Sequence, residues 1–269
     1  MKKKISPALC RKYQGFSRTV ETAKREAERF NSKKGNLKGY DCDICKNRGW
    51  NCIVVDSGNG NYSIAVQECS CQSIRRSLKQ MAESGVDCDI RLKDFLASEP
   101  WQKRMLLTAQ NYIADNNKKW LYVGGQVGCG KTLLCSGVFT GLIKKEGLQG
   151  KYMLWRDEVV KIKACVNIEQ EYTALIEPLK EVPILYIDDF FKVERGKKPT
   201  GADINVAFEI LNYRYNKKLA TIISSELFLK DIVACDEAVG SRIYQLAKLS
   251  CIEVGKDVKK NMRLRDVAV

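Results

Sequence analysis

One stretch of the sequence indicates the fold: Gly125-Gln126-Val127-Gly128-Cys129-Gly130-Lys131-Thr132. It matches the phosphate-loop pattern G-x-x-x-x-G-K-[ST] in full. Glycines let a backbone turn tightly, so that successive N–H groups point inward at phosphate oxygens. Residues 120–123 predict a strand before the loop, and residues 132–145 predict a helix whose positive end also favours an anion. We therefore expect all eight residues to bind a nucleoside triphosphate, with Lys131 at the β- and γ-phosphates and Thr132 on Mg²⁺.

A second motif, Pro183-Ile-Leu-Tyr-Ile-Asp188-Asp189, fits the usual partner of such a loop. Its apolar residues predict a central strand whose carboxyl end brings Asp188 beside the phosphate loop. A buried carboxylate needs a compensating cation, and the coordination shell of Mg²⁺ supplies one. We expect Asp188 to hold Mg²⁺ and Asp189 to orient or deprotonate the attacking water. Together with Lys131 they predict a site that hydrolyses ATP.

Around these motifs, apolar strands alternate with helices from residue 101 onward. Further apolar segments lie at 152–155, 184–187, 220–223 and 251–254, and helical patterns cover 101–114 and 203–217. Apolar strands separated by helices predict a parallel sheet that is covered on both faces. The sequence therefore predicts an α/β fold with a five-stranded parallel sheet.

Four cysteines upstream of the sheet have the spacing of metal ligands: Cys42-x-x-Cys45 and Cys69-x-Cys71, with 23 residues between the pairs. Tetrahedral Zn²⁺ needs two such turns brought together, and a hairpin at residues 58–60 suits a zinc ribbon. The 269-residue chain has 12 cysteines and no histidine, so a zinc site here must be all-thiolate. We expect a zinc-ribbon-like module with Cys52 as a buried neighbour, and an iron–sulfur cluster is the alternative.

Positive charge is concentrated at the start of the chain. The net charge is +14, and residues 1–40, with 12 Lys or Arg and 3 Glu, carry +9 of it. Residues 17–30 predict a basic amphipathic helix with Val20, Ala23, Ala27 and Phe30 on one face. This helix is either solvated or an arm for a partner or nucleic acid.

Composition also sets the expected compartment and domains. The sequence has no apolar run long enough for a membrane helix and no secretory signal, which indicates a cytoplasmic protein. The expected domains are a basic N-terminal helical arm (1–40), a zinc-binding module with its following helix (41–85), a linker (86–100) and the ATPase domain (101–269).

Six segments together carry a family resemblance. They are GGQVGCGKT (124–132), LYIDDFFK (185–192), EILNYRYNKK (209–218), TIISSE (221–226), SRI (241–243) and NMRLR (261–265). In this combination the chain resembles the AAA+ helicase loaders of the DnaC/DnaI type, particularly the versions of Gram-positive phages and prophages. The resemblance spans residues 40–269 and implies an AAA+ ATPase fold behind a zinc-binding N-terminal module.

The resemblance also implies roles for residues outside the first two motifs. Arg242 matches the arginine finger that reaches the γ-phosphate of a neighbouring subunit. Arg263, or the nearby Arg265, matches the arginine that senses nucleotide within its own subunit. Ser225 is the candidate γ-phosphate sensor, and Glu226, which replaces a neutral amide of the family, is expected to point away from the phosphates.

The function implied by the resemblance is an ATPase that loads the hexameric replicative helicase onto single-stranded DNA. Slow, partner-stimulated hydrolysis would time assembly and release, the N-terminal region would contact the helicase, and the ATPase domains would self-associate. The expected ligands are ATP or ADP, Mg²⁺ and Zn²⁺. Arg214 matches a loader arginine, and nucleotide sensing, single-strand contact and the capping of surface acids stay open for it.

Two other functions are compatible with a phosphate loop. One is an IstB-type transposition helper ATPase that binds duplex DNA, and the other is a nucleoside kinase with a four-cysteine zinc site. The position of the zinc module ahead of the ATPase part argues against both.

Overall fold

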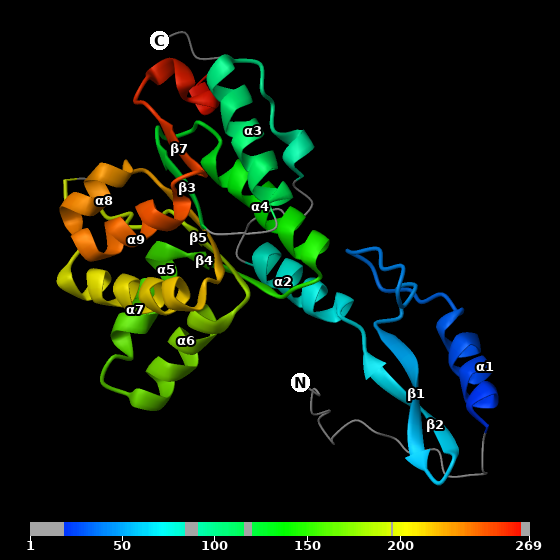
Figure 1. The fold of residues 1–269 in the computed structure, drawn as a ribbon. Helices are drawn as coiled ribbons and strands as arrows, with labels where there is room; N and C mark the ends of the chain where they lie inside the picture. Colours follow the sequence, from blue (N-terminus) through cyan, green and yellow to red (C-terminus); the bar gives the residue numbers. More distant parts are fainter. Residues whose placement is uncertain (1–18, 84–90, 116–119, 195, 265–269) are drawn as a thin grey trace. The chain divides into compact units, whose positions relative to one another are not determined.

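The computed structural model describes residues 19–83, 91–115, 120–194 and 196–264 (Figure 1). Two compact units, Met1–Arg76 and Ser77–Val269, make up the chain. Residues 17 and 18 of the predicted basic helix, residues 86–90 of the predicted linker and Arg265 lie outside the described residues. Within the described part, no helix is both long and apolar enough to cross a membrane.

Five strands form the sheet of the larger unit. They are β3 (Trp120–Gly125), β4 (Gly150–Leu154), β5 (Ile184–Asp188), β6 (Ala220–Ser225) and β7 (Cys251–Val254), in the spatial order β4-β5-β6-β3-β7. Every neighbouring pair is parallel, so the predicted five-stranded parallel sheet is confirmed. Because parallel strands end at the same edge, the phosphate loop after β3 and Asp188 at the end of β5 emerge together, with β6 between them.

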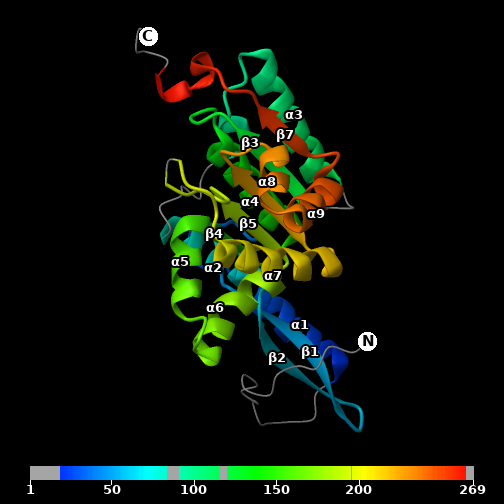
Figure 2. The same ribbon diagram turned by 90° about the vertical axis from the view of Figure 1, so that its left-hand side faces the viewer.

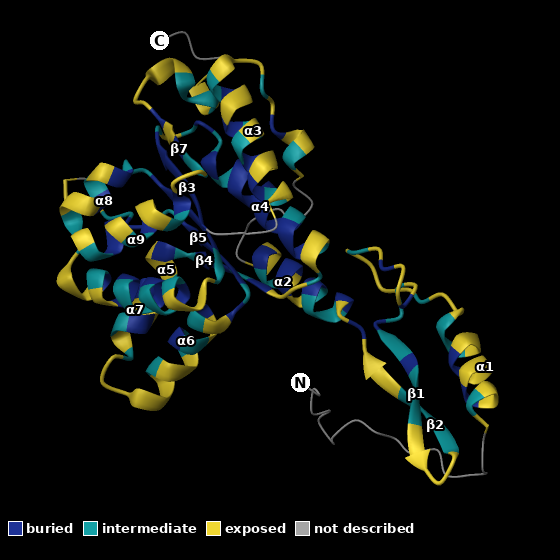
Figure 3. Ribbon diagram, in the orientation of Figure 1, coloured by how far each residue is buried: buried dark blue, intermediate teal, exposed yellow. Residues whose placement is uncertain are grey.

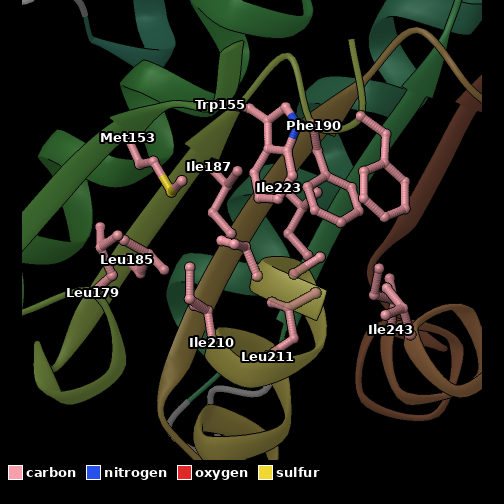
Figure 4. Packing of buried hydrophobic residues seen from close by; sticks show 14 of the residues in the cluster. Met153, Trp155, Leu179, Leu185, Ile187, Phe190, Ile210, Leu211, Ile223 and Ile243 are labelled. Atoms are coloured by element: carbon pink, nitrogen blue, oxygen red, sulfur yellow. The ribbon is translucent and has the colours of Figure 1, made fainter. Parts of the chain in front are cut away.

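Helices cover both faces of this sheet (Figures 1 and 2). On one face lie α3 (Pro100–Ala114) and α4 (Lys131–Glu146); on the other lie α5 (Trp155–Ala164), α6 (Glu169–Glu181), α7 (Gly201–Lys217), α8 (Leu229–Cys235) and α9 (Glu237–Ala247). The main core lies on the second face, where Ile187 and Ile223 of the sheet pack with Ile210 and Leu211 of α7 (Figure 4). This packing fixes the strand ends that carry the candidate site.

One predicted strand ends differently in the structure. The apolar segment 152–155 contributes to β4 only up to Leu154, and Trp155 begins α5. Trp155 is buried edge-on against the stacked rings of Phe190 and Phe191, at centroid distances of 4.8 and 5.5 Å. An apolar run alone does not distinguish a buried strand from the first turn of a buried helix, so the pattern places the strand end one residue too late.

A hairpin and a helix form much of the smaller unit. Strands β1 (Trp50–Gly58) and β2 (Asn61–Glu68) pair antiparallel through the turn Asn59-Gly60. Both turn residues have positive φ (54° and 73°), as a type I′ turn requires. Helix α1 (Val20–Asn31) packs on the hairpin with two alanines of its predicted apolar face buried. The Asn31 side-chain amide joins the helix to β1, because it exchanges two hydrogen bonds with the backbone of Cys52 (2.8 and 2.9 Å).

Helix α2 (Cys71–Glu83) begins in the smaller unit and ends in the larger one. In the larger unit its side chains cover the edge strand β4. Ser77 Oγ accepts a hydrogen bond from Gly150 N (3.0 Å), and the Gln80 side-chain amide exchanges two with the backbone of Tyr152 (2.8 and 3.0 Å). Since an edge strand otherwise leaves backbone groups unpaired, α2 takes the place of a neighbouring strand beside Tyr152.

Candidate functional site

The phosphate loop has the conformation that its glycines permit. Gly125, Gly128 and Gly130 all have positive φ (105°, 73° and 92°). A Cβ on Gly125 would lie 2.1 Å from the carbonyl oxygen of Val254, so a larger residue does not fit there. The next residue, Gln126, donates its backbone N–H to the same carbonyl (2.9 Å). This hydrogen bond attaches the start of the loop to the end of β7, and α4 begins at the other end of the loop, at Lys131.

Lys131 is buried inside its own loop. Its Nζ donates hydrogen bonds to the carbonyl oxygens of Gly125 and Gln126, both at 2.9 Å. The ammonium group of Lys131 carries a positive charge, and the N–H groups in the first turn of α4, which begins at this residue, carry partial positive charge. This arrangement favours a phosphate group at the loop.

Asp188 is buried beneath the loop and accepts hydrogen bonds from four hydroxyl groups. Thr132 Oγ1 lies 3.3 Å from its Oδ1, Tyr186 OH lies 2.7 Å from Oδ1, and Tyr152 OH lies 3.1 Å from Oδ2. Ser224 Oγ also donates to Oδ1. Burial and the nearby charge of Asp188 raise the pKa of Tyr186 and of Tyr152 above the ordinary range, so both phenols stay protonated donors. A carboxylate and a threonine hydroxyl side by side are hard oxygen donors that fit Mg²⁺.

We predict that Tyr152→Phe weakens the response to Mg²⁺. The variant removes one of the four donors that orient Asp188, while the ring and its packing stay in place. The Mg²⁺ concentration at half-maximal nucleotide binding should rise about tenfold or more, since one lost hydrogen bond to a charged group is worth about 1.5–3 kcal/mol. A magnesium titration with a fluorescent nucleotide measures it. Tyr172→Phe is the matched control, because Tyr172 donates to Glu209 away from this site; equal curves for the two variants would contradict the prediction.

Two ion pairs share one lysine near the ends of β5 and β6. Asp189, with a left-handed backbone (φ 53°), accepts from Lys192 Nζ at 2.7 Å, and Lys192 also contacts Glu226 Oε1 at 3.0 Å. Asp189 N donates to Ser224 Oγ (3.1 Å). The structure thus contradicts the expectation that Glu226 points away, because Lys192 neutralises the charge that makes a glutamate near phosphates unfavourable.

The two serines at the end of β6 have separate partners. Ser225 is buried, its hydroxyl donates to the carbonyl oxygen of Phe190 (2.7 Å), and it accepts from Leu227 N (3.1 Å). Ser224, which the sequence reasoning missed, is the serine that contacts both Asp188 and Asp189. The alternation of side chains along a strand explains why neighbouring serines face different groups.

A cavity of about 610 Å³ brings these elements together. Residues 127–132, Asp189, Lys192 and Glu226 line its polar part, and Arg263 also lines it. Phe95, Leu96 and Met262 add an apolar wall of the kind that suits a nucleobase. The backbone N–H of Met262 donates to the carbonyl oxygen of Gly128 (2.9 Å), which attaches the C-terminal turn (Met262–Leu264) to the loop.

Cys129 lines the same cavity with a buried side chain. Burial raises the pKa of its thiol, although the ammonium of Lys131 acts in the opposite direction. The thiol is therefore a neutral part of the wall at neutral pH.

Arg242 lies on α9, away from the cavity of its own chain. Its Nε donates to Asn212 Oδ1 (3.1 Å), one terminal nitrogen donates to the carbonyl oxygen of Ala238 (2.7 Å), and its guanidinium lies over the rings of Phe208 and Tyr215. The side chain is half-buried. It is absent from the described residues that line the cavity.

Arg214 has none of the three roles that the sequence left open. It is fully buried, and its guanidinium donates to Thr221 Oγ1 (2.9 Å) and to four carbonyl oxygens. These carbonyls belong to Leu179, Lys180, Val182 and Ala220. Burial lowers the pKa of Arg214 to about 9, so the group remains charged at neutral pH. The arginine joins the C-terminal end of α6 to the start of β6 and does not reach solvent.

The four predicted metal ligands come together in the smaller unit. The sulfur atoms of Cys42, Cys45, Cys69 and Cys71 all lie within 4.8 Å of one another, and all four side chains are buried. Two of the sulfur–sulfur distances are 3.4 and 3.7 Å, close to the separation that tetrahedral Zn–S bonds of about 2.3 Å produce. Gly49 N donates to Cys45 Sγ (3.2 Å), as expected for a sulfur that carries negative charge. The donor set fits an all-thiolate zinc site.

Sequence comparisons place the chain beside two Bacillus subtilis (strain 168) proteins. No protein-family model matches the chain. It is 34% identical over 145 residues to the uncharacterized protein YqaM, an overlap of 53% of this chain and 45% of YqaM, so the chain spans less than half of that relative. It is 27% identical over 241 residues to XkdC of the phage-like element PBSX, covering 85% of this chain and 88% of XkdC.

Structural comparisons identify the fold. The DnaC helicase loader is similar with a TM-score of 0.55 at 23% identity, over 62% of this chain and 97% of that chain. The replication initiator DnaA bound to AMPPCP and single-stranded DNA is similar with a TM-score of 0.51 at 18% identity, over 66% of this chain and 55% of that chain. The predicted AAA+ fold is confirmed, and the resemblance to the helicase loaders holds at the level of the fold.

Proposed function

We propose that this chain is an ATP-dependent loader of a replicative DNA helicase. The observation that supports it best is the similarity in fold to the DnaC helicase loader, which covers 62% of this chain and 97% of that chain. The similarity to XkdC over most of both chains supports a prophage-type version. The four-cysteine unit ahead of the ATPase part supports a separate module for contact with the helicase.

The cavity supports ATP as the ligand. Lys131 and the loop N–H groups would hold the β- and γ-phosphates, Thr132 and Asp188 would hold Mg²⁺, and Asp189 would accept the proton of the attacking water. Mg²⁺, when bound, would neutralise charge that develops on the phosphate oxygens. Arg263 would contact the nucleotide of its own chain.

The partner contacts of this proposal use other surfaces. Arg242 on the outer side of α9 would complete the site of a neighbouring copy, so self-association is part of the proposal. The residues upstream of the ATPase unit, including the basic segment 1–40 and the zinc module in 41–85, would contact the hexameric helicase. Single-stranded DNA would be held by the assembled ATPase units with a strong salt dependence.

We expect Lys131→Ala to abolish loading. The variant removes the cation of the phosphate site, so ATP hydrolysis should fall by at least about 100-fold. The assay is the transfer of the host helicase onto a circular single strand, measured with ATP, with ADP and without nucleotide. Arg242→Ala should bind ATP normally but fail to load. Wild-type loading by Lys131→Ala, or co-purification with a transposase and not with the helicase, would contradict the proposal.

A further inference from the structure

The ion-paired residues Asp189, Lys192 and Glu226 lie on the wall of the cavity that the phosphate loop also lines. All three line the cavity that Lys131 and Thr132 also line. Lys192 Nζ contacts Asp189 Oδ2 at 2.7 Å and Glu226 Oε1 at 3.0 Å. Without nucleotide, the carboxylate that would receive the proton of the attacking water is therefore occupied by an ammonium group.

We propose that Lys192 is a positioning residue that distinguishes triphosphate from diphosphate. In the empty site it binds Asp189, and a bound γ-phosphate draws it away and so frees Asp189. The proposal rests on the proposed ATPase function and adds to it a residue that makes hydrolysis depend on the γ-phosphate.

The charges of the site favour this exchange. The backbone of Asp189 is fixed, because its N–H donates to Ser224 Oγ and its φ is 53°. The side chain of Lys192, by contrast, is long and flexible, and 37% of it is exposed to solvent. A γ-phosphate brings about two negative charges and three acceptor oxygens to the loop, and a diphosphate lacks that group. Lys192 is thus the mobile partner of the pair.

Glu226 has a defined part in the exchange. It contacts the same Nζ from the end of β6, so it keeps Lys192 at the cavity wall when the contact with Asp189 opens. Partial burial acts to lower the pKa of Lys192, but the two carboxylates outweigh it and the pKa is raised. Lys192 is therefore protonated in the position where it contacts both carboxylates.

The freed Asp189 then acts in hydrolysis. Water loses a proton to the Asp189 carboxylate as its oxygen bonds to the γ-phosphorus, and the bond from that phosphorus to the bridging oxygen breaks. The products are ADP and inorganic phosphate. Asp189 then releases its proton to the solvent, and departure of the phosphate removes the competing anion, so that Lys192 returns to the Asp189 carboxylate.

The experiment compares the affinities of the full chain for AMPPCP and for ADP, both with Mg²⁺. Lys192→Met should weaken AMPPCP binding about tenfold, the size of one charge-assisted hydrogen bond, and leave ADP binding within about twofold. Lys192→Arg should restore the preference because it keeps the charge. The matched control is Lys197→Met, since Lys197 forms the same i,i+3 ion pair with Glu194 (2.6 Å) on the exposed surface.

The outcomes separate this inference from the proposed function. If the ratio of the AMPPCP and ADP affinities is the same in Lys192→Met as in the wild type, the role of Lys192 is overturned. Nucleotide binding by the wild type, and with it the proposed function, is not affected by that result. Absence of nucleotide binding by the wild type would overturn both. A lower affinity in Lys197→Met would show that surface charge alone produces the effect, which also overturns it.

Discussion

Chelation of zinc should unfold the smaller unit (Met1–Arg76) and leave the larger unit (Ser77–Val269) folded. Among its described residues, the buried apolar side chains are two alanines, five cysteines and Ile74. The strands β1 and β2 are mostly half-buried or exposed, as Figure 3 shows. So small an apolar core contributes little hydrophobic stabilisation, whereas structural zinc contributes about 10–16 kcal/mol. The four thiolates are therefore the centre of this unit.

Limited proteolysis and far-UV circular dichroism measure the effect before and after a strong chelator, with zinc content followed by atomic emission. Cleavage should appear between residues 31 and 76, and added Zn²⁺ should restore protection. Cys45→Ser should behave as the chelated protein. Cys52→Ser is the matched control, because Cys52 is equally buried in this unit but lies outside the four-cysteine cluster. Persistent protection without metal would show that the hairpin and α1 fold on their own contacts.

The features predicted correctly from sequence are those that a short stretch specifies by itself. The phosphate loop needs its glycines at fixed offsets, and the turn at Asn59-Gly60 needs positive φ at both residues. Each strand of the sheet is an apolar run between helices. Such local rules predict which elements exist, although the end of β4 at Leu154 shows that they place element ends less well.

The contacts across the sheet could not be predicted in this way. Periodicity does not say that β5 and β6 are neighbours, and this adjacency brings Ser224 to Asp188 and Asp189 and brings Glu226 to Lys192. Lys192, which pairs with Glu226, lies 34 residues earlier in the chain. The sequence around Glu226 therefore gives no sign that its charge is neutralised. Tyr152 reaches Asp188 from the edge strand, a contact that the sequence pattern does not specify either.

The environment of Arg214 is the clearest example of a feature that the sequence pattern does not predict. A charged residue in an amphipathic helix pattern indicates an exposed face, yet this side chain is completely buried. The carbonyl groups that stabilise it come from α6 and its end, 32 to 35 residues earlier in the chain, and from β6. Only the tertiary structure brings these acceptors around one guanidinium.

Arg214→Met should destabilise the larger unit strongly. The change removes the donor for four carbonyl oxygens and for the Thr221 hydroxyl, in hydrogen bonds that are buried or partly buried. A buried acceptor left without a donor costs about 1–3 kcal/mol, so we expect a total loss of about 4 kcal/mol or more. That is a large part of the stability of a typical domain, about 5–15 kcal/mol.

Urea unfolding of the full chain, followed by circular dichroism with zinc present, measures this loss as a lower transition midpoint. Arg214→Lys should fall between the wild type and Arg214→Met, because one ammonium cannot reach both the α6 carbonyls and Ala220. Lys217→Met on the same helix is the control and should shift the free energy by no more than about 0.5 kcal/mol, since its side chain is exposed. If Arg214→Met unfolds at the wild-type midpoint but loses binding to single-stranded DNA, the buried arginine has a functional role that its contacts with α6 and β6 do not explain.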